Sequence, residues 1–307
     1  MNLVFLGTPD FAVPVLENLI NSRHKVLAAV TQPDRKRDRN TLSFSPVKEC
    51  ALKHGVEVLQ YEKVSRDGIE RIRSLKPDVI ITAAFGQMLS REFLEIAPFG
   101  VLNVHASLLP AYRGSSPIQW TVVNGERETG VTIMKTAFKM DSGDIILQRR
   151  LAVGEDETAG ELFPRLSVLG AEALIEALDA VESGTAVYTP QDEAAATYYP
   201  MLKKGDGLID FKKSAKEIKQ SVQGFTPWPS AFTYYNGKML KIIKVGLADG
   251  KGKSGEVLVA DPKNGLVAAT ADGALSIEII QPENGRKMSA KDYLLGHKIP
   301  TGVILGE

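Results

Sequence analysis

The sequence has very little cysteine and no long hydrophobic run. Its single cysteine, Cys50, excludes an internal disulfide and is typical of proteins of the reducing cytoplasm. None of its apolar runs approaches the roughly 18 residues that a membrane-spanning helix needs. Met1 is followed almost at once by a strand-like segment, which leaves no room for a signal or transit peptide. We therefore expect a cytoplasmic protein without a membrane partner.

The sequence also has no net charge, because 37 Lys and Arg residues balance 37 Asp and Glu residues. The charges are distributed unevenly: residues 207–307 contain 14 basic and 10 acidic side chains, whereas residues 1–206 contain 23 and 27. A mildly basic C-terminal part suits a polyanionic partner, but it does not indicate one by itself.

A glycine-rich dinucleotide-binding motif is absent from the first strand-to-helix turn. That turn reads Gly7-Thr8-Pro9-Asp10 instead of G-x-G-x-x-G. A nicotinamide or flavin cofactor therefore loses its main support in the sequence.

The first half of the sequence alternates apolar strands with helices. We expect strands at residues 2–7, 25–31, 56–59, 78–84 and 101–104, and helices at residues 14–21, 46–54, 67–75 and 90–97. Strands that are apolar throughout and separated by helices are typical of a parallel sheet covered on both faces. The pattern predicts an α/β, Rossmann-like fold with a mostly parallel sheet and helices on both faces.

The C-terminal part has a different pattern. About five short strand-like runs follow residue 230, and Asn236-Gly237 between the first two is a strong hairpin signal. Ser289 and Asp292 have the spacing of a helix cap. We predict a small OB-like β-barrel. The expected domains are residues 1–189 and 207–307, joined by a linker at residues 190–206, where prolines and small residues replace clear periodicity.

The most informative polar residues follow the strand at residues 101–104. Asn103 and His105 are two residues apart, so they project from the same face near the carboxyl end of that strand, where ligands bind in open α/β sheets. Asp141 follows in a loop between two later strands. An amide donor, an imidazole and a carboxylate suit acyl transfer, which needs fixed donors for an oxyanion and a route for protons. If Asp141 approaches His105, it would orient the imidazole and stabilise its charge.

Other interpretations of these residues remain open. A buried histidine is often satisfied by a backbone carbonyl and has no further role. One His and one Asp without a second His or a Cys make a poor transition-metal site, so we expect no metal. Ser107 could act as the nucleophile of a Ser-His-Asp triad with His105 and Asp141, but it lacks the G-x-S-x-G context of a nucleophile elbow.

The order of these motifs resembles that of the folate-dependent formyltransferases. The shared pattern is Asn-x-His-x-Ser-Leu-Leu-Pro from Asn103, followed by Asp-x-Gly-x-Ile from Asp141. The resemblance extends from residues 4–11 to residues 288–296. Over this length the sequence is most similar to the members of the family that act on tRNA. It implies transfer of a formyl group from 10-formyltetrahydrofolate to the amino group of initiator methionyl-tRNA, for translation initiation.

The resemblance also implies roles for individual residues. The catalytic residues that it implies are Asn103, His105 and Asp141. Thr132 stands where related enzymes have a hydroxyl that supports this network. Folate contacts are implied for Ser107, Leu108, Leu109, Pro110, Gln87 and Met88.

A basic loop at residues 32–45 is longer than the usual connection of about 2–6 residues in such folds. Its cations, Arg35, Lys36, Arg37 and Arg39, suit either contacts with phosphates or simple solvation. The resemblance implies that Arg35, Arg37 and Arg39 bind the tRNA acceptor arm. The loop lacks the glycine that is usual in the family, which leaves open which arginine makes which contact.

The sequence is compatible with more than one acceptor, with a non-catalytic role, and with several roles for Arg113. The acceptor could instead be an amino-sugar nucleotide or glycinamide ribonucleotide, although enzymes for the latter usually have one domain. The chain could also be a non-catalytic RNA-binding protein with the same fold. Arg113 suits a phosphate, the folate glutamate tail or a structural role equally well. We expect a monomer, because nothing in the sequence marks a large exposed apolar surface.

Overall fold

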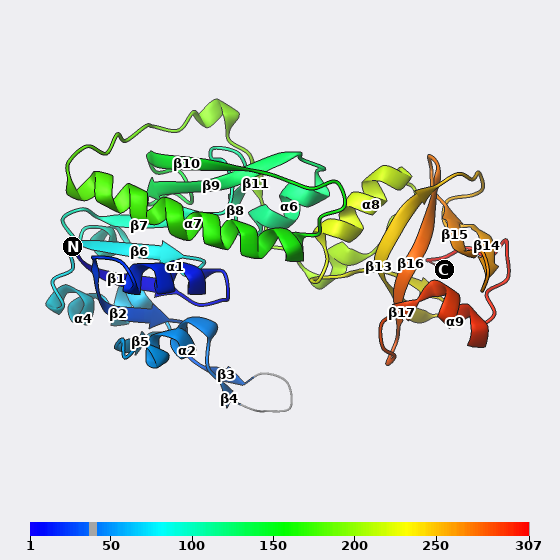
Figure 1. Cartoon of the computed structure of the whole chain (residues 1–307), viewed down its shortest axis with the longest axis horizontal. Coiled ribbons are helices and arrows are strands. Elements are labelled where there is room, and N and C mark those ends of the chain that lie inside the picture. The colour runs from blue at the N-terminus through cyan, green and yellow to red at the C-terminus, as the bar shows by residue number, and fades with distance from the viewer. Residues whose placement is uncertain (37–41, 307) are drawn as a thin grey trace. The chain divides into compact units, whose positions relative to one another are not determined.

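The computed structural model describes residues 1–36 and 42–306 (Figure 1). The chain forms two compact units. Unit 1 comprises Met1–Pro117, Glu128–Ala152 and Phe163–Tyr199, and unit 2 comprises Ile118–Arg127, Val153–Leu162 and Pro200–Glu307. The residues expected as a linker, 190–206, are divided between the two units. Within the part of the chain that the structure describes, no helix has both the length and the apolar character that crossing a bilayer requires.

A seven-stranded sheet with the order β10-β9-β7-β6-β1-β2-β5 forms the centre of unit 1 (Figure 1). Five neighbouring strands are parallel: β1 (Asn2–Gly7), β2 (Lys25–Thr31), β5 (Val58–Gln60), β6 (Val79–Ala83) and β7 (Val101–His105). On the β7 side of these strands, β9 (Glu128–Lys135) is antiparallel to β7, and the edge strand β10 (Ile145–Ala152) is antiparallel to β9. The predicted mostly parallel α/β sheet is therefore confirmed.

Helices cover both faces of this sheet, which explains why its strands are apolar throughout. On one face, Ile72 of α4 and Phe93 of α5 pack in one buried cluster with Val4 and Ile80 of the sheet. On the other face, α7 comes so close that a Cβ on Gly170 would lie 2.7 Å from Val104. The helices of unit 1 are α1 (Ala12–Ile20), α2 (Pro46–Lys53), α3 (Val64–Asp67), α4 (Ile69–Ser74), α5 (Arg91–Leu94) and most of α7 (Ala159–Glu182), whereas α6 (Pro117–Val123) belongs to unit 2 from Ile118 onward.

Unit 2 contains the predicted β-rich C-terminal part. Its antiparallel sheet has the order β12-β13-β16-β15-β14, and β17 pairs with β16. Asn236 and Gly237 have φ angles of 50° and 70°, as the predicted hairpin turn requires. The elements are α8 (Ala215–Gly224), β12 (Ala231–Tyr235), β13 (Lys238–Ala248), β14 (Val257–Asp261), β15 (Gly265–Ala269), β16 (Ala274–Pro282), β17 (Met288–Ser289) and α9 (Ala290–Gly296).

The C-terminal tail joins the two edges of this sheet. The backbone N–H of Gly302 donates to the carbonyl of Val257 in β14, and that of Gly306 donates to the carbonyl of Tyr234 in β12, both at 2.8 Å. The predicted cap of α9 is present, because the hydroxyl of Ser289 accepts from the N–H of Asp292 at 3.0 Å. The tail thus satisfies backbone groups on both edge strands, which would otherwise be free to pair with another chain.

Candidate active site

Asn103 lies on β7 with its side-chain amide oriented by the neighbouring strand. Thr82 of β6 stands opposite it in the sheet, and the Thr82 hydroxyl donates to Asn103 Oδ1 at 2.8 Å. Because the amide oxygen is occupied in this way, the NH2 group is the end available to a ligand. Among the described residues this NH2 group has no hydrogen-bond partner, and the side chain is half-buried. Asn103 therefore presents two N–H donors in a fixed direction.

His105 ends the same strand and is only 6% exposed. Its Nε2 lies 3.0 Å from the backbone carbonyl oxygen of Tyr112, which can only accept a hydrogen bond. This contact places a proton on Nε2 and directs the opposite nitrogen, Nδ1, toward Asp141. The distance from Nδ1 to Asp141 Oδ1 is 3.8 Å.

The carboxylate of Asp141 is held by a backbone group from a different segment. Its Oδ2 accepts from the N–H of Gly114 at 2.8 Å, so Oδ1 is left to face His105. At 3.8 Å the two side chains are at ion-pair distance and too far apart for a direct hydrogen bond. The structure thus brings an amide, an imidazole and a carboxylate from two separate segments to one edge of the sheet.

The loop after β7 is fixed from inside the protein. Ser107 is fully buried, and its hydroxyl donates to the carbonyl of Ala111 at 2.7 Å. The hydroxyl of Thr132 donates to the carbonyl of Ser107 at 2.6 Å and accepts from the N–H of Leu109 at 3.1 Å. Thr132 stands opposite His105 in the pairing of β7 with β9, but its hydroxyl supports the loop backbone and makes no described hydrogen bond to His105 or Asp141.

These contacts restrict what the loop offers to a ligand. Ser107 and Leu109 are buried, whereas Leu108 and Pro110 are partly exposed. A folate molecule at this loop would therefore contact Leu108, Pro110 and the backbone, and not the Ser107 side chain. A Ser-His-Asp triad is not formed, because the Ser107 hydroxyl and His105 Nε2 bond to different backbone carbonyls.

The two other residues expected at the folate differ in exposure. Both ends of the Gln87 side-chain amide are held within the protein, because Nε2 donates to the carbonyl of Tyr61 and Oε1 accepts from the N–H of Val64. These bonds leave the Gln87 backbone and the second N–H of Nε2 for a ligand. Met88 beside it is 60% exposed, so its side chain is accessible.

The basic loop is described only in part. Arg35 begins the short strand β3 (Arg35–Lys36), which pairs with β4 (Leu42–Ser43). Arg37 and Arg39 lie outside the described residues.

Arg113 has a structural environment that the sequence did not disclose. It is fully buried, and its guanidinium binds Gln191, Glu193 and Tyr198. With these partners it is not available to a phosphate or a folate tail. Gln191 in turn donates to the backbone carbonyl of Asp141 at 2.9 Å, a contact with the site loop that no motif in the sequence indicates.

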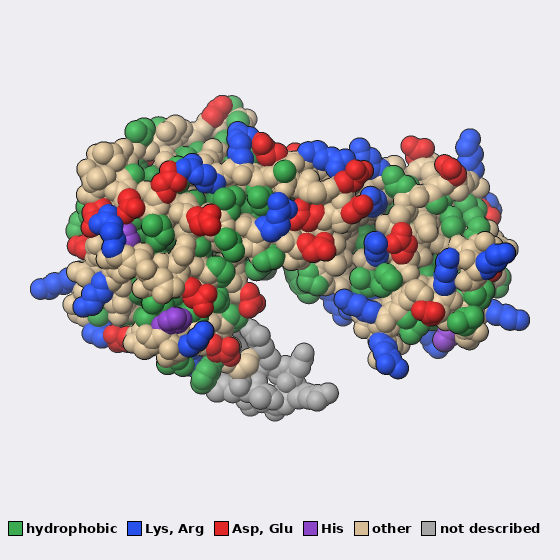
Figure 2. Space-filling view, viewed as in Figure 1, with side chains coloured by type: hydrophobic (Ala, Val, Ile, Leu, Met, Phe, Trp, Pro, Cys, Tyr) green, Lys and Arg blue, Asp and Glu red, His purple; other side chains and the backbone are tan. Residues whose placement is uncertain are grey.

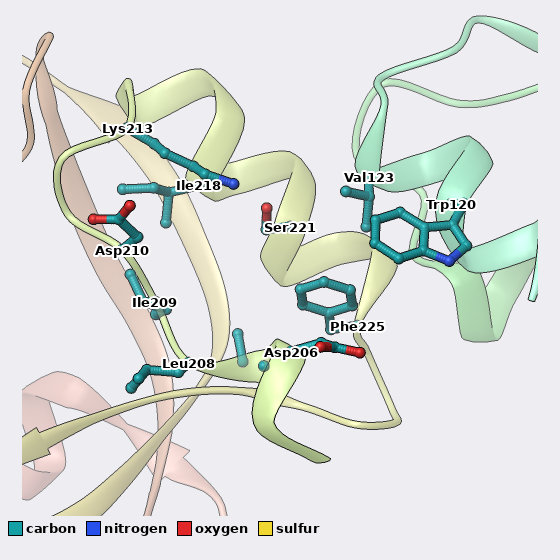
Figure 3. A pocket seen from close by; sticks show the side chains of 12 residues that line it. Trp120, Val123, Asp206, Leu208, Ile209, Asp210, Lys213, Ile218, Ser221 and Phe225 are labelled. Carbon is teal, nitrogen blue, oxygen red and sulfur yellow. The ribbon is translucent and has the colours of Figure 1, made fainter. Parts of the chain in front are cut away.

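A separate pocket of about 210 Å³ lies within unit 2 (Figure 3). It is lined by the ring of Phe225 and by Trp120, whose indole N–H donates to the carbonyl of Pro200 at 3.0 Å. None of the residues that line this pocket belongs to the Asn103, His105 and Asp141 set.

Comparison with known proteins agrees with this geometry. Residues 1–178 match the family described as formyl transferase, and residues 201–298 match the formyl transferase C-terminal domain. The methionyl-tRNA formyltransferase of Geobacter metallireducens is 46% identical over 308 residues, covering 100% of this chain and 99% of that protein. The chain belongs to the methionyl-tRNA formyltransferase family. The corresponding protein of Ruminiclostridium cellulolyticum is 44% identical, with full coverage of both chains.

Solved structures share the fold of this methionyl-tRNA formyltransferase family member at lower identity. An N-formyltransferase from Helicobacter canadensis, in complex with folinic acid and dTDP-3-aminofucose, has a TM-score of 0.69 at 20% identity, covering 93% of this chain and 99% of that one. HypX from Aquifex aeolicus in complex with tetrahydrofolic acid has a TM-score of 0.63 at 19% identity, covering 98% and 50%. The family expected from the Asn-x-His and Asp-x-Gly motifs is confirmed.

Proposed function

We propose that this chain transfers a formyl group from 10-formyltetrahydrofolate to the amino group of initiator methionyl-tRNA in the cytoplasm, to supply translation initiation. Full-length relatives that bear the name methionyl-tRNA formyltransferase support the acceptor. The single observation that carries the chemistry is the meeting of Asp141 and His105, at 3.8 Å, beside the free NH2 group of Asn103.

The reaction requires a donor for an oxyanion. The methionyl amine attacks the formyl carbon, a new C–N bond forms, and the carbonyl oxygen becomes negative before the bond to N10 of the folate breaks. Fixed donors lower the barrier most, because they need no reorganisation as this charge develops. Asn103 meets that requirement, since the Thr82 hydroxyl holds its amide oxygen and leaves its N–H bonds directed outward.

The reaction also moves one proton, from the attacking amine to the leaving nitrogen. We assign this transfer to His105 and Asp141. The Tyr112 carbonyl and the Gly114 N–H fix the two side chains from behind, so that Nδ1 and Oδ1 face each other. Asp141 is 15% exposed at its side chain, which lets a reacting amine reach the carboxylate. A carboxylate with one oxygen held and one oxygen free suits a base that accepts and returns a proton.

Recognition of tRNA is assigned to cations outside the catalytic residues. Arg35, Arg37 and Arg39 in the basic loop would contact phosphates of the acceptor arm. Figure 2 also shows many Lys and Arg side chains on the surface of unit 2. Phosphate contacts of this kind position the nucleic acid and make its affinity dependent on salt.

An acceptor assay tests the proposed function. The donor is offered together with methionyl-tRNA, an amino-sugar nucleotide or glycinamide ribonucleotide, and release of tetrahydrofolate is followed. Release with methionyl-tRNA alone is the expected result. Release with only the amino-sugar nucleotide would overturn the acceptor, and tight tRNA binding without release would indicate a non-catalytic RNA-binding protein.

A further inference from the structure

The segment that follows α7 makes contacts that bear directly on the catalytic residues. We call residues 189–199 the strap; all of them belong to unit 1. At its start, Thr189 and Ile145 exchange backbone hydrogen bonds of 2.8 and 2.9 Å. At its end, β11 (Tyr198–Tyr199) pairs with β8 (Arg113–Gly114), and the two are labelled next to each other in Figure 1. The strap is therefore anchored at both ends before its side chains are considered.

Gln191 is the strap residue that reaches the loop of Asp141. Its Nε2 donates to the backbone carbonyl of Asp141 at 2.9 Å and to that of Gly143 at 2.7 Å. Its Oε1 accepts from Nε and Nη2 of Arg113, at 3.1 and 2.8 Å. One amide thus uses both ends to join the Asp141 loop to a fully buried guanidinium.

The backbone at Asp141 needs such support. Asp141 has a φ angle of 49°, in the left-handed region that is costly for a residue with a side chain. The N–H bonds from Gln191 hold the carbonyls on both sides of Ser142, so they fix the direction in which the Asp141 carboxylate leaves the loop. Together with the N–H of Gly114, which holds Oδ2, these bonds keep Asp141 Oδ1 at 3.8 Å from His105 Nδ1.

The strap also holds the two backbone groups that orient the catalytic side chains. The Thr197 hydroxyl accepts from the N–H of Tyr112 at 2.8 Å, and the rings of Tyr112 and Tyr199 stack at 4.8 Å. Gly114 has a φ angle of 117°, and a Cβ there would lie 2.1 Å from the carbonyl oxygen of Tyr199. Tyr112 and Gly114 are the residues whose backbone contacts His105 and Asp141.

We propose that Gln191 is a positioning residue for formyl transfer, which it promotes by holding Asp141 in line with His105. This inference rests on the proposed function and adds to it a residue that does not touch the reacting atoms. Small errors in the placement of a catalytic group reduce the rate strongly, by about 100-fold for a displacement near 1 Å. Loss of Gln191 should therefore reduce kcat and leave both KM values nearly unchanged.

The test uses full-length protein and two variants at one position. Gln191→Ala removes the whole link, whereas Gln191→Glu keeps the acceptor for Arg113 and removes the donors to the Asp141 and Gly143 carbonyls. Both should lower kcat by roughly 10- to 100-fold. Asp192→Ala is the matched control, because Asp192 is exposed and its described contact only caps the following turn. We expect its kcat to equal that of the wild type.

A double-mutant cycle separates positioning from a general loss of structure. If Gln191 acts through Asp141, Gln191→Ala should lower kcat by less than about threefold when Asp141→Asn is already present. A drop in the double variant as large as in the wild type would overturn the proposal, as would wild-type kcat in both Gln191 variants. If Gln191→Ala does not fold, Gln191→Glu completes the same cycle. A wild-type protein that does not formylate methionyl-tRNA would instead refute the proposed function.

Discussion

Polar side chains at the carboxyl end of β7 differ from those on the surface of unit 2 in how many partners they have. At β7, Asn103, His105 and Asp141 are each held by one defined partner and keep one defined group free. In unit 2, among the described residues after 206, ion pairs are seen for Lys219 and Lys244, and most other basic side chains have none. Formyl transfer requires catalytic groups whose orientation is fixed before the reaction. Phosphate binding requires basic side chains that are not already paired with a carboxylate of the protein. Substitutions in the two regions should therefore change different kinetic constants.

The largest expected effect comes from the carboxylate. Asp141→Asn keeps an oxygen for the N–H of Gly114 but removes the base, so kcat should fall by about 10²- to 10⁴-fold. The change should leave the KM for methionyl-tRNA unaltered, because the proposed tRNA contacts are made by basic side chains and not by Asp141. Steady-state formylation kinetics measure both values. A raised KM with an unchanged kcat would remove Asp141 from the chemistry.

The next effect comes from the oxyanion donor. Asn103→Ala should lower kcat by about 10²- to 10³-fold, as loss of one such donor typically does. Thr82→Val provides the comparison, because it keeps Asn103 and removes only the hydroxyl that orients it. The Thr82 variant should show a clearly smaller loss. Equal losses in the two variants would mean that orientation, and not the donor itself, limits the rate.

Substitutions in the basic loop should change the binding of tRNA, whereas substitutions of Asn103, His105 or Asp141 should change kcat. Arg37→Ala and Arg39→Ala should each raise the KM for tRNA and reduce the slope of log affinity against log salt by about 0.7–0.9 per lost phosphate contact. The KM for the folate donor should stay the same. Arg71→Ala is a matched control, because that exposed arginine is paired with Glu57. An unchanged salt slope in the loop variants would exclude the loop from the tRNA interface.

The smallest expected effect concerns stability at acid pH. Hydrogen bonds from Arg113 and Lys139 lower the pKa of Glu193 from 4.5 to about 2. The resulting stabilisation is fully present above pH 4.5 and disappears as the pH falls through about 2. The difference in free energy of unfolding between wild type and Glu193→Gln should therefore shrink over that range. Urea unfolding at several pH values measures it, and a difference that grows on acidification would contradict this account.

Local patterns in the sequence predicted a large part of this molecule. The buried strand that carries Asn103 and His105, the Asn236-Gly237 turn and the Ser289 cap all depend on neighbouring residues, so spacing and residue type are sufficient to find them. The placement of Asp141 near His105 was expected from the motif and agrees with the geometry.

Other features depend on contacts between distant segments. Gln191 lies 50 residues from Asp141 and 78 from Arg113 in the sequence, and the lack of periodicity around it predicts a linker. The family resemblance implies a folate contact for Ser107, but it does not reveal that tertiary packing buries the hydroxyl against the carbonyl of Ala111. The contact between His105 and the Tyr112 carbonyl cannot be predicted from residue type, because every residue has a backbone carbonyl.

The most direct test of the central claim is the single-turnover formylation rate of His105→Ala with both substrates saturating. The account predicts a rate at least about 100-fold below that of the wild type, with tRNA and folate dissociation constants that change by less than about twofold. A wild-type rate in this variant, under the same saturation, would contradict it.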